Sequence, residues 1–122
     1  MVEAKMCEFN TKKRNPHFDT VMDIDAEELL QLAAQVQIID VRQPDEYTGE
    51  LGHIEGAELV VLDTLPENLD RLSRRQPVVF VCRSGGRSAR AADFAFQNGF
   101  QNTYNMEGGM IRWNQLGLPL AK

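Results

Sequence analysis

Short apolar runs recur along this chain, and segments with helix-like spacing separate them. The runs cover residues 20–22, 36–41, 59–62, 78–81 and 103–106. Most of them lack the polar alternation of a strand with one face in water, so they are typical of parallel strands covered on both faces. The alternation of such strands with helices predicts an α/β fold. We therefore expect a single open parallel five-stranded sheet with helices on both faces.

The chain of 122 residues is long enough for one domain and too short for two ordinary ones. Residues 1–17 mix charges and break all periodicity, which predicts a flexible N-terminal arm followed by one domain over residues 18–122. The first helix of that domain is expected after Asp25, with Glu28 completing a capping box.

Charge and hydropathy exclude several classes of protein. The formal net charge of −5 argues against a nucleic-acid partner. No apolar run approaches the ~18–20 residues that cross a bilayer, and the first residues lack the apolar stretch of a secretory signal. These features predict a cytoplasmic protein that has no membrane among its partners. The two cysteines, Cys7 and Cys82, form no disulfide framework, and His17 and His53 stand at no ligand spacing to them, so no metal is expected.

The segment after the most apolar run carries the clearest chemical signal. Cys82 directly follows this run, and a helix is expected from about Ser88. A strand–loop–helix connection of this kind turns backbone N–H groups toward an anion. Gly85 and Gly86 allow the tight turn, and nearby arginines add positive charge. We therefore predict a nucleophilic Cys82 thiolate and a substrate-binding loop. The predicted loop residues are Arg83, Ser84, Gly85, Gly86, Arg87 and Ser88.

A second polar segment follows the run at 36–41 and should reach the same edge of the sheet, where ligands of such sheets bind. Arg42 is predicted to contact the substrate, and Asp40 to support the site. Asp40 and Arg42 could also contact each other, and Glu46 could pair with Arg42. His53 is interpreted as a hydrogen-bonded structural residue, because a thiolate nucleophile needs no base.

Four motifs taken together resemble the rhodanese homology domain. They are IIDVRQPDEY, GHIEGA, CRSGGRS and YNMEGGMIRW, and they occur in the family's order from about Val21 to Leu120. The resemblance implies a doubly wound sheet, a cysteine at position 82 that forms a persulfide, and transfer of a sulfane sulfur. It is closest to the single-domain form of the family and implies no cofactor. The expected partners are a thiosulfate-like donor and a cyanide or thiol acceptor.

Loop length separates the chemistries within this resemblance. Sulfurtransferases of the fold have a six-residue loop, here Cys82 to Arg87, whereas related phosphatases and arsenate reductases place an arginine where this chain has Ser88. A phosphatase or arsenate reductase is therefore disfavoured. A sulfur relay that passes the persulfide to a protein partner stays open as an alternative. Two-domain thiosulfate enzymes often carry a lysine at the position of Ser84, and this departure weakens the expectation of rapid thiosulfate turnover.

Overall fold

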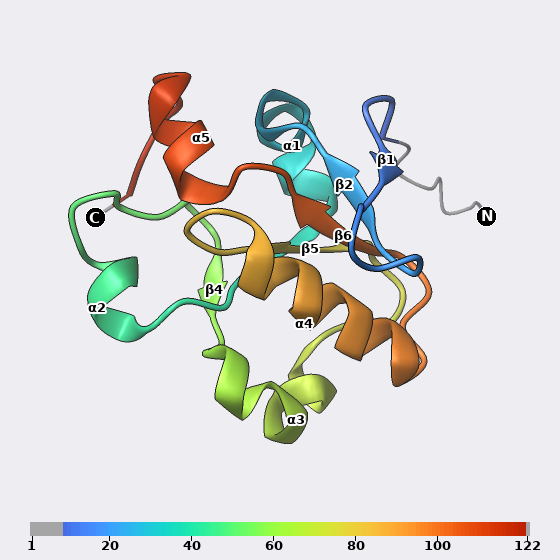
Figure 1. Ribbon diagram of the computed structural model, residues 1–122. Helices are drawn as coiled ribbons and strands as arrows, with labels where there is room; N and C mark the ends of the chain where they lie inside the picture. Colours follow the sequence, from blue (N-terminus) through green and yellow to red (C-terminus); the bar gives the residue numbers. More distant parts are fainter. Residues whose placement is uncertain (1–8, 122) are drawn as a thin grey trace.

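The computed structural model describes residues 9–121, and its centre is one twisted sheet (Figure 1). In spatial order the strands are β1 (Lys13–Arg14), β2 (Met22–Ile24), β6 (Thr103–Met106), β5 (Val78–Val81), β3 (Gln37–Asp40) and β4 (Glu58–Leu59). The five strands from β2 to β4 run parallel, which confirms the predicted fold. The sixth, β1, pairs antiparallel with β2 and was not expected.

Helices cover both faces of the sheet, and each face has its own apolar core (Figure 1). Helices α1 (Ala26–Leu32) and α5 (Gly109–Gln115) contact each other over one face. Helix α4 (Gly86–Gln97) packs on the other face, where α3 (Leu65–Asn68) adds its Leu65. Strand β5 serves both cores, because Val79 and Val81 lie in the first and Val78 and Phe80 in the second. The remaining helical segments are short: α2 (Pro44–Tyr47) and 3-10 turns at Ala33–Gln35, Leu62–Thr64 and Leu69–Arg71.

Residues 9–17 pack against the sheet, which differs from the loose arm expected for residues 1–17. Phe9 is 2% exposed, and its ring lies 4.9 Å from that of Tyr104. The carboxylate of Glu28 accepts hydrogen bonds from the backbone N–H groups of Asn10 and Thr11. Glu28 therefore anchors this segment instead of completing the predicted capping box. Residues 1–8 lie outside the part of the chain that the structure describes.

The carboxyl ends of the parallel strands meet at one edge of the sheet. Asp40 ends β3, Cys82 follows β5, and Glu107 follows β6, where its backbone N–H donates to the carbonyl of Ile24 at the end of β2. This edge therefore gathers the loops whose chemistry the sequence singled out. Within residues 9–121, no helix has the length and apolar character needed to cross a membrane.

Candidate active site

Cys82 lies at the base of the loop between β5 and α4, and its side chain is 1% exposed. The backbone N–H of Gly85 donates to its Sγ atom over 3.0 Å, and the Oγ atom of Ser88 lies 3.2 Å from the same sulfur. Gly85 has a φ of 110°, a left-handed conformation that favours glycine, and it is the N-cap of α4. The first N–H groups of α4 have no acceptor within the helix, so the end of the helix beside this loop has hydrogen-bond donors available to an anion.

Helix α5 fixes the outer side of this loop. The N–H of Met110 donates to the carbonyl of Cys82 at 2.9 Å, and that of Ile111 to the carbonyl of Arg83 at 3.0 Å. The two backbones approach closely at Gly109, where a Cβ atom would lie 2.4 Å from the Arg83 carbonyl oxygen. Gly109 also has a φ of +59°. Gly109 therefore allows α5 to approach the backbone of the loop closely.

Arg87 reaches from α4 to α2 and forms a two-point ion pair with Glu46. Its two terminal nitrogens lie 2.8 and 2.9 Å from the Glu46 carboxylate oxygens. Hydrogen bonding from Arg87 holds the pKa of Glu46 at about 2, well below its ordinary value of 4.5. The same pairing raises the pKa of Arg87, and the nearby Cys82 sulfur adds to that effect. The expectation that Glu46 pairs with Arg42 is therefore wrong, and Glu46 braces the loop instead.

Asp40 and Arg42 contact each other in the interior of the protein. Each side chain is 1% exposed, and the guanidinium Nε and Nη2 atoms donate to the Asp40 carboxylate at 2.9 and 2.8 Å. Nη2 also donates to the carbonyl of Gly52 at 2.8 Å. This differs from the predicted substrate contact of Arg42. Its buried guanidinium instead ties the loop around Gly52 to the end of β3.

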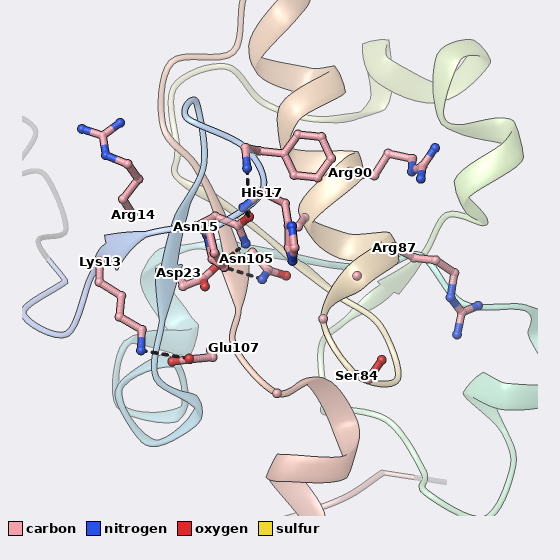
Figure 2. A pocket seen from close by; sticks show the side chains of 16 residues that line it. Lys13, Arg14, Asn15, His17, Asp23, Ser84, Arg87, Arg90, Asn105 and Glu107 are labelled. Carbon is pink, nitrogen blue, oxygen red and sulfur yellow. Dashed lines mark hydrogen bonds and ion pairs between the residues drawn. The ribbon is translucent and has the colours of Figure 1, made fainter.

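The other predicted loop residues lie at the surface. Arg83, Ser84 and Gly86 are exposed, and Arg87 is half-buried. Ser84, Gly86 and Arg87 border a cavity of about 830 Å³, whose opposite wall is the N-terminal segment (Figure 2). Side chains from that wall and from the floor include Lys13, Arg14, Asn15, His17 and Asp23. Arg83 instead lines a smaller hollow that it shares with Arg42 and Glu46.

Sequence reasoning missed three buried polar residues that connect with this site. Asn105 accepts from Ser88 and donates to Asp23, and Asn15 donates to the same Asp23 carboxylate. Asp23 and Asn105 stand opposite each other in the parallel register of β2 and β6. For Asp23 and Asn105 the available signal was a polar residue inside a short, buried strand, because a buried polar side chain needs a hydrogen-bond partner. Asn15 lies outside the strands and gave no such signal.

The remaining candidates have structural contacts or lie outside the described residues. The Nδ1 atom of His53 donates to the carbonyl of Tyr47 at 2.9 Å, and the two rings stack 3.7 Å apart. Cys7 lies outside the described residues. Among residues 9–121, no three His, Cys, Asp or Glu side chains gather in a way that could hold a metal ion.

The ion pair between Glu46 and Arg87 should give the protein a measurable acid sensitivity. Because the folded-state pKa of Glu46, about 2, lies below its ordinary value of 4.5, this stabilisation is present above pH 4.5 and is lost as the pH falls toward 2. We expect a contribution of about 1–2 kcal/mol, allowing for solvent screening at a partly exposed pair. Urea unfolding of the wild type and of Glu46→Gln from pH 6 down to pH ~2.5 measures it. Stability curves that stay parallel over this range would contradict the assignment.

The fold of the chain agrees with the comparison to known proteins. The profile of the Rhodanese-like domain matches residues 25–116, and the chain belongs to this family. A sulfurtransferase of Allochromatium vinosum is 33% identical over 104 residues, which cover 83% of this chain and 95% of the relative. A thiosulfate sulfurtransferase, GlpE, of Pseudomonas paraeruginosa is 31% identical over 99 residues, covering 80% of this chain and 88% of that protein.

A solved structure and a further relative extend the comparison. The crystal structure of a rhodanese-related protein from Thermoplasma volcanium superposes with a TM-score of 0.75 at 30% identity, covering 81% of this chain and 96% of that one. The uncharacterised protein YqhL of Bacillus subtilis is 38% identical over 79 residues, and the match spans only 61% of its length. The relatives named sulfurtransferase support a role in sulfur transfer in general.

Proposed function

We propose that Cys82 accepts a sulfane sulfur from a small anionic donor such as thiosulfate, carries it as a persulfide, and passes it to cyanide or a thiol. The observation that carries this proposal is the environment of Sγ. The sulfur accepts the Gly85 N–H at 3.0 Å within a six-residue loop that leads into the N-terminus of α4. Backbone donors in this arrangement stabilise a negative charge on sulfur. The sulfurtransferase names of the relatives support the same reaction class.

Loading is a displacement at sulfur. The Cys82 thiolate attacks the sulfane sulfur of thiosulfate, a new S–S bond forms, and the old S–S bond breaks so that its electron pair leaves with sulfite. The negative charge then resides on the outer sulfur of the persulfide. The N–H groups of residues 86–88, which have no acceptor within α4, are the donors available to it. A thiol or cyanide then attacks that outer sulfur and releases the Cys82 thiolate, so ping-pong kinetics are expected.

Intact-mass measurement tests the loading step directly. Wild-type protein mixed with thiosulfate should gain the mass of one sulfur atom, and a second addition of cyanide or a small thiol should remove it. A wild type that gains no sulfur from thiosulfate would contradict the donor. If the persulfide forms but small acceptors discharge it slowly while a protein thiol does so rapidly, the relay alternative holds.

The arginines of the loop should determine how well thiosulfate is used. A dianion must approach an anionic sulfur, so cationic side chains at the rim lower the cost of approach. Arg87→Ala and Arg83→Ala should therefore raise the KM for thiosulfate more than they slow discharge of the persulfide to a neutral thiol. We expect about 1–3 kcal/mol for each, the range for a lost charge-assisted hydrogen bond. High salt should weaken thiosulfate use by the wild type in the same direction.

Arg75→Ala is the matched control, because Arg75 is exposed shortly before β5, at the amino end of this strand, away from the loop. Steady-state kinetics at several salt concentrations compare the three variants. Wild-type thiosulfate kinetics in both loop variants, without salt dependence, would show that these side chains only brace the loop. The donor would then not be a small dianion.

A further inference from the structure

A row of buried polar side chains runs from the N-terminal segment to the reactive sulfur. Asn15 and Asn105 each donate a side-chain N–H to the Oδ1 atom of Asp23 at 2.9 Å (Figure 2). The Oγ atom of Ser88 lies 2.5 Å from the Oδ1 atom of Asn105 and 3.2 Å from the Sγ atom of Cys82. None of these side chains is more than 5% exposed. Side chains buried to this extent depend mainly on hydrogen-bond partners within the protein.

The direction of the hydrogen bonds is fixed from the far end of the row. The Oδ1 atom of Asn15 accepts the backbone N–H groups of His17 and Phe18, so its NH₂ group must face Asp23. An ionised carboxylate can only accept, so Asn105 must also present its NH₂ group to Asp23. The carbonyl oxygen of Asn105 is left facing Ser88. Ser88 must then donate its hydroxyl proton to Asn105.

Ser88 has one proton, and two acceptors compete for it when Cys82 is a thiolate. With a neutral thiol there is no conflict, because the S–H group can donate to the Ser88 oxygen while the hydroxyl donates to Asn105. With a thiolate, the Ser88 hydroxyl has two unfavourable choices. If it donates to the sulfur, no proton lies between the Ser88 and Asn105 oxygens, which are 2.5 Å apart. If it donates to Asn105, a lone pair of the Ser88 oxygen faces the negatively charged sulfur. In the persulfide the negative charge lies on the outer sulfur, so the conflict at Sγ is relieved.

We propose that Asp23 and Asn105 are positioning residues that commit the Ser88 proton to Asn105 and thereby disfavour the free Cys82 thiolate relative to the thiol and the persulfide. The effect on the persulfide rests on the proposed function. During discharge the acceptor thiolate bonds to the outer sulfur, the bond from that sulfur to Sγ breaks, and Cys82 leaves as a thiolate. A less stable leaving thiolate slows this step, so the network favours retention of the bound sulfur.

Other charges near the sulfur act together with this network. They include Arg87 on α4, which is paired with Glu46, the buried pair of Asp40 and Arg42 after β3, and the exposed Arg83 of the loop. The cavity beside Asp23 and Asn105 is also lined by Lys13, which is paired with Glu107, and by His17 and Arg90. Removing Asp23 changes both the local charge and the direction of the hydrogen bonds. The experiment must therefore separate these two effects.

Two substitutions of Asp23 provide this separation. Asp23→Asn removes the charge but keeps an oxygen that accepts from Asn15 and Asn105, so the direction is retained. Asp23→Leu removes the charge and also the acceptor, so Asn105 is free to turn and Ser88 can donate to the sulfur. Each is made alone and combined with Ser88→Ala. The readout is the rate of iodoacetamide alkylation of Cys82 against pH, which needs no sulfur donor.

We expect the half-maximal alkylation rate of Asp23→Leu to occur about one pH unit below that of Asp23→Asn, a tenfold change in the ratio of thiolate to thiol. In the Ser88→Ala background the two variants should coincide. The loaded Asp23→Leu protein should also discharge to a fixed thiol about threefold faster than Asp23→Asn. Equal alkylation profiles of the two single variants, or a difference that persists without Ser88, would overturn the proposal.

Asn105→Leu gives a second test if Asp23→Leu fails to fold. It removes the acceptor of the Ser88 proton directly, and its alkylation profile should move to lower pH only when Ser88 is present. Thermal unfolding monitored by circular dichroism verifies that each variant is folded. Because alkylation does not depend on persulfide formation, a protein that accepts no sulfur would contradict the proposed function and leave this test intact.

Discussion

Replacement of Cys82 by serine or alanine is expected to reduce sulfur transfer to the background rate while the fold is retained. The proposed reaction requires a sulfur atom that attacks and then carries the transferred sulfur, and neither a hydroxyl nor a methyl group can form the persulfide. The loop itself should survive, because its carbonyl groups are held by Met110 and Ile111 of α5, and neither contact involves the Cys82 side chain. Transfer from thiosulfate to cyanide and the circular dichroism melting curve measure the two parts of this prediction.

Cys7→Ser is the matched control for this experiment. Cys7 lies in a polar sequence with Lys5 and Glu8 nearby, and it lacks the glycines and arginines that surround Cys82. We expect this variant to keep nearly full activity and to gain one sulfur atom in the intact-mass measurement. If the Cys7 variant lost as much activity as the Cys82 variants, the single-cysteine mechanism would be contradicted, and the reaction would need two thiols.

Replacement of Asp40 by leucine is expected to have the largest effect on stability. Asp40 and Arg42 are each 1% exposed, so the substitution leaves a buried guanidinium without its carboxylate. Breaking a buried ion pair by removing one partner costs about 3–5 kcal/mol. This is a large fraction of the ~5–15 kcal/mol that stabilises a typical domain. Urea denaturation at neutral pH measures the loss.

The double variant Asp40→Leu/Arg42→Leu tests the physical reason for that loss. Removal of both charges leaves no buried ion, so the double variant should recover part of the stability that Asp40→Leu loses. The recovery should be incomplete, because the contact of Arg42 with the Gly52 carbonyl is also lost. A loss below about 1 kcal/mol in Asp40→Leu would show that the pair contributes little to the fold.

Local sequence patterns predicted the parts of the structure that depend on neighbouring residues. The runs at 78–81 and 103–106 became β5 and β6 without change of bounds, because both are fully buried. In the run at 59–62 only Leu59 belongs to a strand, β4, and Leu62 begins a 3-10 turn. The helix expected from Ser88 begins at Gly86, because Gly85 adopts a left-handed conformation and caps it.

The candidate site also has a part that the local sequence predicted and a part that it did not. The loop from Cys82 to Ser88 could be predicted because it is continuous in sequence and follows an apolar run. The partners that brace it could not, because Arg87 and Glu46 are 41 residues apart and Asn105 and Asp23 are 82 residues apart. Nothing in either local sequence indicates which distant side chain the sheet brings alongside. The packing of Phe9 likewise depends on the distant Tyr104, so composition alone predicted a loose arm.

The short outer strands of the sheet restrict how another protein can bind. In the described part of the chain, β1 and β4 border the sheet, and each is two residues long. Strand β1 consists of the exposed Lys13 and Arg14, and charged short edges discourage further strand pairing. A peptide or a second copy of the chain that added a strand to the sheet would therefore have few backbone N–H and C=O groups to pair with. A protein acceptor would meet Cys82 through side-chain contacts at the rim of its loop, where affinity depends on shape and charge.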